Sequence, residues 1–341
     1  RRNIPAKVVM PEFAEKNNLG IFALKYDGKE MPLISIIIPS KNHKDILERC
    51  INSIENKTSY KNYEIIIVDN ESDEEETLQY LSSLKHKVIK LGNINNKFNF
   101  SRMVNYGIKN CDGEYVVLLN NDTEVIAESW LEDMLVYMSI NGVGVVGSKL
   151  LYSDHSVQHG GVVLKMGNGV AGHAFKLIQN LDGGYMSFAN VARNYSAVTA
   201  ACFMTTKKIY EAVGGFDEEN FAVSYNDVDF CMKVKQIGKR IVYNPQALLY
   251  HHEGKSRGVE QTGHFSDPKE EYNFINKWGI DSYFVDEYYN PNLSVENELF
   301  QVNYKDVYID DKKPKNILLI THNLNFEGAP IVQKNISLGL L

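Results

Sequence analysis

The sequence predicts an α/β protein with a mostly parallel central sheet. Continuous apolar runs of strand length lie at residues 33–38, 63–68 and 114–119, as is typical of strands buried on both faces. Segments with the apolar spacing of helices separate these runs, and this alternation is typical of βαβ units. The apolar fraction of 44% and the charged fraction of 23% exclude a disordered, fibrous or coiled-coil protein.

The first part of the chain shows this alternation most clearly. Residues 1–31 are mixed in character, and we expect them to pack on the main domain as a leader. The strand at 33–38 ends at Pro39, and apolar residues mark one face of a helix at 45–55. A strand at 63–68, a helix opened by acidic residues 73–76, a strand at 88–91, a helix at 101–110 and a strand at 114–119 follow.

From Gly142 onward glycines become frequent, which predicts short strands and loops over a substrate. Further elements are expected as a strand at 198–204, helices at 207–213 and 227–237, strands at 239–243 and 247–250, and a helix at 267–279. Residues 312–315 are typical of a linker, and residues 316–320 are expected to form another buried strand before a glycine-containing loop.

Charge and composition exclude several classes of protein. With 43 acidic and 36 basic residues the net charge is −7, so the broad basic surface of a nucleic-acid-binding protein is absent. No apolar run approaches the ~18 residues of an integral membrane segment. The four cysteines form no C-x-x-C pair, which predicts buried thiols in the cytoplasm and no zinc site on them. We therefore expect a cytoplasmic protein, with a peripheral position at the inner face of the membrane as the alternative. The absence of an initiator Met predicts that the sequence is a fragment of a longer protein.

Polar residues follow three of the predicted strands, at 40–42, 69–70 and 120–122. Ligands bind outside the carboxyl ends of the strands in such sheets. Turn formation alone explains one such end, whereas three converging ends favour a binding site.

Carboxylates and imidazoles mark candidate positions for chemistry. Asp122 follows a buried strand, where a carboxylate can hold a divalent cation against a diphosphate. His251 and His252 end another strand, and only one of them can face a ligand. Asp227 and Asp229 lie at a helix start, so each is either a helix cap or, in a cleft, a general base.

Taken in order, these motifs resemble the family-two glycosyltransferases of GT-A fold, and most closely the bacterial surface-polysaccharide and rhamnosyltransferase branch. The motifs are at 39–42, 68–72, 98–102, 119–125, 226–229 and 251–258. The resemblance implies a GT-A domain at 32–300, with a nucleotide-binding half at 32–125 and a smaller mixed acceptor half at 126–300. A linker at 301–315 would follow. Residues 316–341 resemble the truncated start of a GT-B-type domain, which implies a tandem second glycosyltransferase.

The resemblance also implies a nucleotide pocket. Asp69 would bind the uracil or thymine edge, and Arg102 would approach the diphosphate. The remaining residues implied to bind the donor nucleotide are Pro39, Ser40, Asn42, Ser72, Asn120 and Asn121.

The same resemblance implies the metal and catalytic residues. Asp122 matches the last carboxylate of the D-x-D motif for Mn²⁺ or Mg²⁺, while Asn120 stands where the first Asp usually lies. His251 would be a further metal or diphosphate ligand, with His252 as the alternate. Asp227 matches the general base, and Asp229 would have a structural or acceptor-orienting role.

The predicted function is therefore metal-dependent, inverting transfer of a sugar from a nucleoside-diphosphate sugar to a hydroxyl of a glycan or glycoconjugate acceptor. A UDP-sugar is the favoured donor and a dTDP-sugar the alternative. A non-catalytic nucleotide- or glycan-binding scaffold is a second hypothesis, against which the presence of Asp122 and Asp227 argues. A sugar nucleotidyltransferase is a third, but residues 39–43 after the first strand lack the glycines of a phosphate loop.

Overall fold

The computed structural model describes residues 4–92, 97–252 and 267–303. Residues 1–302 form one compact unit. Most of the predicted linker, the predicted second transferase domain at 316–341 and residues 253–258 of the last motif lie outside the described residues. Within the described segments no helix is long and apolar enough to cross a membrane.

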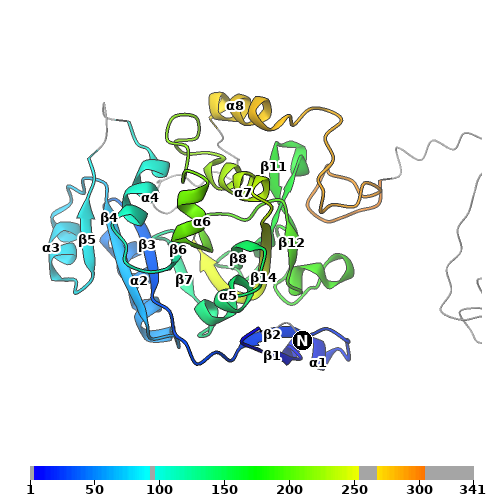
Figure 1. Cartoon of the computed structure of the whole chain (residues 1–341), viewed down its shortest axis with the longest axis horizontal. Coiled ribbons are helices and arrows are strands. Elements are labelled where there is room, and N and C mark those ends of the chain that lie inside the picture. Colours follow the sequence, from blue (N-terminus) through cyan, green and yellow to red (C-terminus); the bar gives the residue numbers. More distant parts are fainter. Residues whose placement is uncertain (1–3, 93–96, 253–266, 304–341) are drawn as a thin grey trace, which may run out of the picture. The chain divides into compact units, whose positions relative to one another are not determined.

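A ten-stranded sheet forms the centre of this unit (Figure 1). Its strands are β3 (Ile34–Ser40), β4 (Tyr63–Asp69), β5 (Lys87–Lys90), β6 (Tyr115–Leu119), β7 (Thr123–Val125), β8 (Val143–Leu151), β9 (Val157–His159), β12 (Arg193–Tyr195), β13 (Cys202–Thr206) and β14 (Arg240–His251). Eight of them follow the order β12-β14-β8-β13-β6-β3-β4-β5, while β7 pairs with β14 and β9 with β8.

The two halves of the sheet differ in strand direction. Strands β6, β3, β4 and β5 run parallel, which confirms the α/β prediction for the first part of the chain. Strand β13 runs antiparallel to both β6 and β8, and β14 runs parallel to β8. The second half is therefore mixed, and the carboxyl ends of β3, β4 and β6 meet at one edge.

Helices cover both faces of the sheet. Helices α2 (Lys44–Lys57), α3 (Glu75–Ser83) and α5 (Trp130–Met138) pack in one apolar core with strand residues such as Ile36 and Ile67. Helices α4 (Phe100–Lys109), α6 (Lys207–Ala212), α7 (Asn226–Gln236) and α8 (Pro268–Trp278) share the other core with Ile37 and Ile66. Because consecutive strand residues face opposite sides, the β-branched runs supply both cores.

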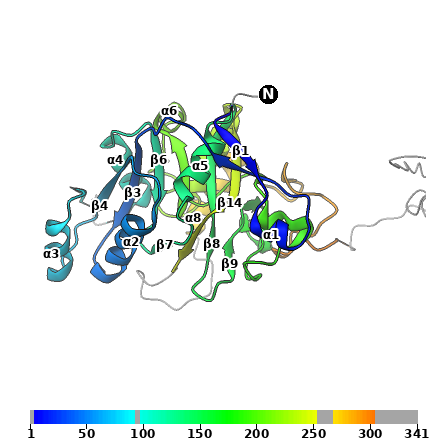
Figure 2. The same ribbon diagram turned by 90° about the horizontal axis from the view of Figure 1, so that it is seen from below.

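Smaller elements lie outside the main sheet. Strands β1 (Ala6–Val9) and β2 (Ala23–Tyr26) pair antiparallel, with helix α1 (Glu12–Lys16) between them in the sequence, and β2 packs against α5. Figure 2 shows β1 and α1 of this dark-blue segment from below. In the glycine-rich segment, β10 (Val162–Leu164) pairs with β11 (Ala171–His173), and two 3₁₀ helices, η1 (Met166–Asn168) and η2 (Tyr185–Asn190), accompany them.

Three predicted details are wrong. Strand β3 does not end at Pro39, since Pro39 and Ser40 pair with Val68 and Asp69 of β4. The strands expected at 239–243 and 247–250 are one strand, β14, with a register shift against β8 between Asn244 and Leu248. The glycine-rich region, predicted to hold only short strands and loops, begins with β8, a nine-residue strand that is buried throughout. Helix α5 was not among the predicted elements.

Candidate active site

The carboxyl ends of the parallel strands hold a cluster of buried polar residues. Ser40 at the end of β3 pairs with Asp69 at the end of β4. Asn121, just after β6, donates from its side-chain Nδ2 to the Ser40 Oγ at 3.2 Å. The three predicted strand ends thus meet at one place in the sheet. Pro39 is buried in the same strand as Ser40.

Asp69 has one occupied and one unpartnered carboxylate oxygen. Its Oδ1 accepts hydrogen bonds from the Ser72 backbone N at 3.1 Å and from the Ser72 Oγ at 2.6 Å. Its Oδ2 is buried and has no hydrogen-bond partner among the described residues. An unpaired buried carboxylate oxygen costs free energy, so this atom is suited to a hydrogen-bond donor on a ligand.

Asn42 and Ser72 join the loops that follow β3 and β4. The Asn42 backbone N donates to the Ser72 Oγ at 2.8 Å. The Asn42 side chain accepts from the Asp73 backbone N at 2.9 Å and donates to the Asp73 Oδ1 at 2.6 Å. Asn42 has a φ of 52°, a left-handed conformation that Asn tolerates better than most residues. Both residues hold the loop that presents Asp69.

Asp122 and His251 lie together at the end of β6 and β14. The His251 Nε2 is 3.1 Å from the Asp122 Oδ1 and 3.2 Å from the Asn120 Nδ2. Adjacent ligands of an octahedral Mg²⁺ lie about 3 Å apart when both bonds are about 2.1 Å. The spacing of Asp122 and His251 therefore fits two neighbouring ligands of one divalent cation.

The described residues do not enclose a complete metal site. No group of three or more His, Cys, Asp or Glu side chains able to hold a metal occurs among them. Two protein ligands fit a cation that keeps waters and takes phosphate oxygens from a bound nucleotide.

His252 faces the other side of β14. Its Nδ1 is 2.7 Å from the Ser153 Oγ, and its Nε2 is 3.4 Å from the Glu124 Oε2. Its ring also stacks on Tyr250. The structure thus places the ring of His251, and not the ring of His252, beside the Asp122 carboxylate, as the alternation of strand side chains requires.

Asp227 lies in the first turn of α7. Its Oδ2 accepts from the Ala200 backbone N at 2.9 Å, and its Oδ1 accepts from the Val228 backbone N at 2.8 Å. Burial raises the pKa of this carboxyl above its usual 3.8, although these backbone N–H groups oppose the shift. A raised pKa makes the ionised carboxylate a stronger base.

Asp229 has a different environment. It is fully buried, and its carboxylate contacts the Trp278 Nε1 at 3.0 Å, the Lys277 Nζ at 2.8 Å and the Lys233 Nζ at 3.3 Å. These contacts attach α8 to α7. The N-cap of α7 is Tyr225, so neither aspartate is the helix cap that the sequence left open.

A cavity of about 190 Å³ is lined by both His251 and Asp227. Side chains of α7, the residues before β13, β14 and the segment around β9 to β11 form its walls. The lining residues are Phe100, Asn120, Gln158, His173, Thr199, Ala200, Ala201, Val223, Asn226, Asp227 and His251. Three of the residues predicted from the sequence, Asn120, Asp227 and His251, therefore share one cavity although more than 130 positions separate the first from the last.

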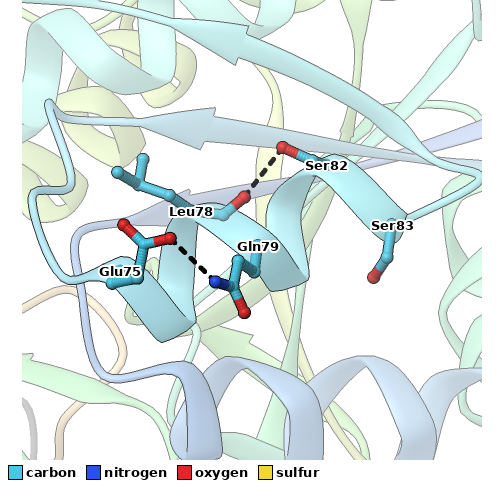
Figure 3. Close-up of a pocket in the computed structure, with 5 residues that line it drawn as sticks. All are labelled: Glu75, Leu78, Gln79, Ser82 and Ser83. Atoms are coloured by element: carbon cyan, nitrogen blue, oxygen red, sulfur yellow. Dashed lines mark hydrogen bonds between the residues drawn. The ribbon is translucent and has the colours of Figure 1, made fainter.

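Arg102 lies in the first turn of α4, and its Nη1 donates to the Gly92 carbonyl O at 2.8 Å. It is not among the residues that line the cavity. A second hollow runs along α3 (Figure 3). All its lining residues belong to that one helix, and their hydrogen bonds, such as Gln79 to Glu75, are internal. It contains no predicted site residue.

The glycine-rich segment contributes further polar side chains from β9 and β11. His159 is fully buried, and burial lowers the pKa of its ring well below the usual 6.5. His173 lines the cavity. Gln158 both lines the cavity and contacts His251. Gln158 was not among the predicted site residues, and its only signal in the sequence is the short motif Gln158-His159-Gly160-Gly161.

Comparison with known proteins identifies related sequences and folds. The model of the family described as Glycosyl transferase family 2 matches residues 35–214. An uncharacterized protein of Sinorhizobium fredii, y4gI, is 40% identical over 272 residues, which are 79% of this chain and 30% of that protein. The O-antigen biosynthesis protein RfbC of Myxococcus xanthus is 33% identical over 277 residues, 80% of this chain and 21% of that protein. The chain spans less than a third of both relatives.

A solved structure shows the same architecture. The crystal structure of GalNAc-T7 with UDP, GalNAc and Mn²⁺ superposes with a TM-score of 0.54 at 13% identity, over 74% of this chain and 55% of that chain. This likeness supports the GT-A fold, a central mixed sheet between helices, predicted from the sequence motifs.

Proposed function

The chain belongs to glycosyl transferase family 2, and we propose that it transfers a sugar from a nucleoside-diphosphate sugar to a hydroxyl group of a glycan acceptor. The observation that carries this proposal is the cavity lined by both Asp227 and His251. A candidate base and a candidate cation ligand face the same space. Transfer between a diphosphate leaving group and an acceptor hydroxyl needs both.

In this proposal the reaction is a single displacement. Asp227 takes the proton of the acceptor hydroxyl, and the acceptor oxygen forms a bond to the anomeric carbon. The bond from that carbon to the diphosphate oxygen breaks, and the nucleoside diphosphate leaves. The anomeric centre is inverted because one attack from the opposite side replaces the leaving group.

Asp122 and His251 would hold the divalent cation, Mn²⁺ or Mg²⁺, together with the donor's diphosphate. When bound, the cation supplies Lewis-acid stabilisation of the charge on the leaving group. Asn120 donates to the His251 Nε2, and a cation bound at this nitrogen would replace that hydrogen bond.

The donor nucleotide is proposed to bind at the cluster of Ser40, Asp69 and Asn121. The buried Asp69 Oδ2 suits the N3–H of uracil or thymine, so UDP- and dTDP-sugars are the donor classes. Pro39, Asn42 and Ser72, which end or follow β3 and β4, are proposed to line the same pocket. Arg102, whose Nη1 contacts the Gly92 carbonyl O after β5, is proposed to approach the diphosphate.

A bacterial surface polysaccharide is the proposed acceptor class, because the relative from Myxococcus xanthus carries the name of an O-antigen biosynthesis protein. A cytoplasmic location with access to the membrane face, and a tandem second transferase domain, stay predictions.

Incubation with a panel of UDP- and dTDP-sugars in the presence of Mn²⁺ tests the proposal. Nucleoside diphosphate should be released from at least one donor, with transfer to oligosaccharides of surface-polysaccharide type. Asp227→Asn should slow this release by about 10²- to 10⁴-fold while nucleotide binding persists. Nucleotide binding without any turnover in the wild type would instead favour the non-catalytic scaffold hypothesis.

A further inference from the structure

We propose that Gln158 is a positioning residue, which holds His251 in the tautomer and orientation that a divalent cation requires. The inference rests on the proposed function, since it takes His251 to be a cation ligand. It adds to that function a residue from a different strand, β9, that acts on the cation only through His251.

Gln158 contacts His251 with both atoms of its amide. Its Nε2 donates to the His251 carbonyl O at 3.3 Å, and its Oε1 is 2.7 Å from the His251 Nδ1. A carbonyl can only accept, so the amide nitrogen must face the main chain and the amide oxygen must face the ring. Gln158 is 3% exposed, which limits the alternative positions of this side chain.

This arrangement selects one tautomer of His251. An amide oxygen can only accept, so the His251 Nδ1 carries the proton, and the Nε2 of the neutral ring keeps its lone pair. The Asn120 amide is consistent with this tautomer, because its Nδ2, a donor, lies 3.2 Å from the Nε2. Two amides on opposite sides of the ring therefore leave the Nε2 as an acceptor.

The His251 Nε2, an acceptor in this tautomer, faces a second acceptor, the Asp122 carboxylate. The Asp122 Oδ1 lies 3.1 Å from the His251 Nε2. Two electron-rich atoms held at this distance attract a cation, and the lone pair on the Nε2 is the form of imidazole that coordinates one. Without Gln158 the ring can place a proton on the Nε2 and hydrogen-bond to Asp122, which blocks coordination.

The pairing of the strands fixes the contact between Gln158 and His251. Strand β9 pairs with β8 through Leu150 and His159, and β8 pairs with β14 through Leu151 and Tyr250. Gln158 and His251 thus extend from strands that flank the same central strand.

Mn²⁺ titration of the full chain in the presence of UDP tests the proposal. Gln158→Leu should weaken Mn²⁺ binding by about 10- to 100-fold, the usual effect of losing the partner of a metal-bound histidine. Gln158→Glu keeps an acceptor for the Nδ1 proton and should stay within a few-fold of the wild type. Gln246→Leu is the matched control, because Gln246 lies on the same strand as His251 but outside the cavity lining. Equal Mn²⁺ affinity in the wild type and a folded Gln158→Leu variant would overturn the inference.

Nitrogen NMR of the histidine rings provides a test that needs neither metal nor nucleotide. The His251 signal, assigned with a His251→Asn variant, should show a protonated Nδ1 in the wild type and in Gln158→Glu. In Gln158→Leu the protonated Nε2 form should appear. An Nε2-protonated ring in the wild type would overturn the proposal about Gln158. Failure of the wild type to bind Mn²⁺ with UDP, despite the expected tautomer, would instead count against the proposed function.

Discussion

Replacing Asp69 by Asn tests how the protein binds a nucleobase. The Asp69 Oδ1 is held by the Ser72 backbone N and Oγ, and the Oδ2 is buried without a described partner. The Asn side chain can keep an oxygen toward Ser72. It then places an NH₂ group where the Oδ2 faced the ligand, so a donor meets the N3–H donor of uracil.

The expected cost follows from the hydrogen bond that is lost. A hydrogen bond to a charged group contributes about 1.5–3 kcal/mol, and about 1.4 kcal/mol corresponds to a factor of ten in Kd. Asp69→Asn should therefore weaken UDP binding by about 10- to 150-fold. The loop contact to Ser72 should survive, so the melting temperature should change little.

Calorimetric titration of UDP in the presence of Mn²⁺ measures this effect. Asp112→Asn is the matched control, because exposed Asp112 precedes β6 at the opposite edge of the sheet and should bind UDP as the wild type does. Unchanged UDP affinity in Asp69→Asn, with the protein folded, would refute the assignment of Asp69.

Three further predictions concern catalysis, the cation and stability. Asp227→Asn should lower the rate of sugar transfer by about 10²- to 10⁴-fold with unchanged UDP affinity, and a comparable loss of affinity would show a binding role instead. His251→Ala should remove the Mn²⁺ dependence of UDP binding, whereas His252→Ala should leave it in place, and the reverse pattern would exchange their roles. Burial raises the pKa of Asp133 to about 6 from 3.8. The folded state thus binds the Asp133 proton more tightly than the unfolded state does. The free energy of unfolding should therefore fall as pH rises from about 4 to about 6, by at most about 3 kcal/mol. In thermal unfolding measured between about pH 4 and pH 6, Asp133→Asn should not show this fall in stability. The same pH dependence in the variant as in the wild type would contradict the raised pKa of Asp133.

Strand ends could be located from the sequence because their physical cause is local. The runs at 33–38, 63–68 and 114–119 are rich in β-branched and other apolar residues, so strand formation and burial agree along each run. Parallel strands end at one edge of a sheet, which is why Ser40, Asp69 and Asn121 could be expected to meet. That Asp227 and His251 share a cavity was implied only by the family resemblance, since they come from α7 and β14.

Strand β8 was missed because its glycines have a packing role. A Cβ on Gly144 would lie 2.4 Å from the Val234 Cγ1, and one on Gly147 would lie 2.5 Å from the Val198 Cβ. These glycines allow neighbouring side chains to approach the strand, a long-range requirement with no local signal. The pairing of Gln158 with His251 escapes sequence analysis for the same reason, because 93 positions separate them.

The most direct test of the account is a titration of UDP into the protein with and without Mn²⁺, repeated with Asp122→Asn. Mn²⁺ should strengthen UDP binding in the wild type, because Asp122, His251 and the diphosphate are proposed to share one cation. The Asp122→Asn variant should lose this gain in affinity. UDP binding of equal strength with and without Mn²⁺ in the wild type would contradict it.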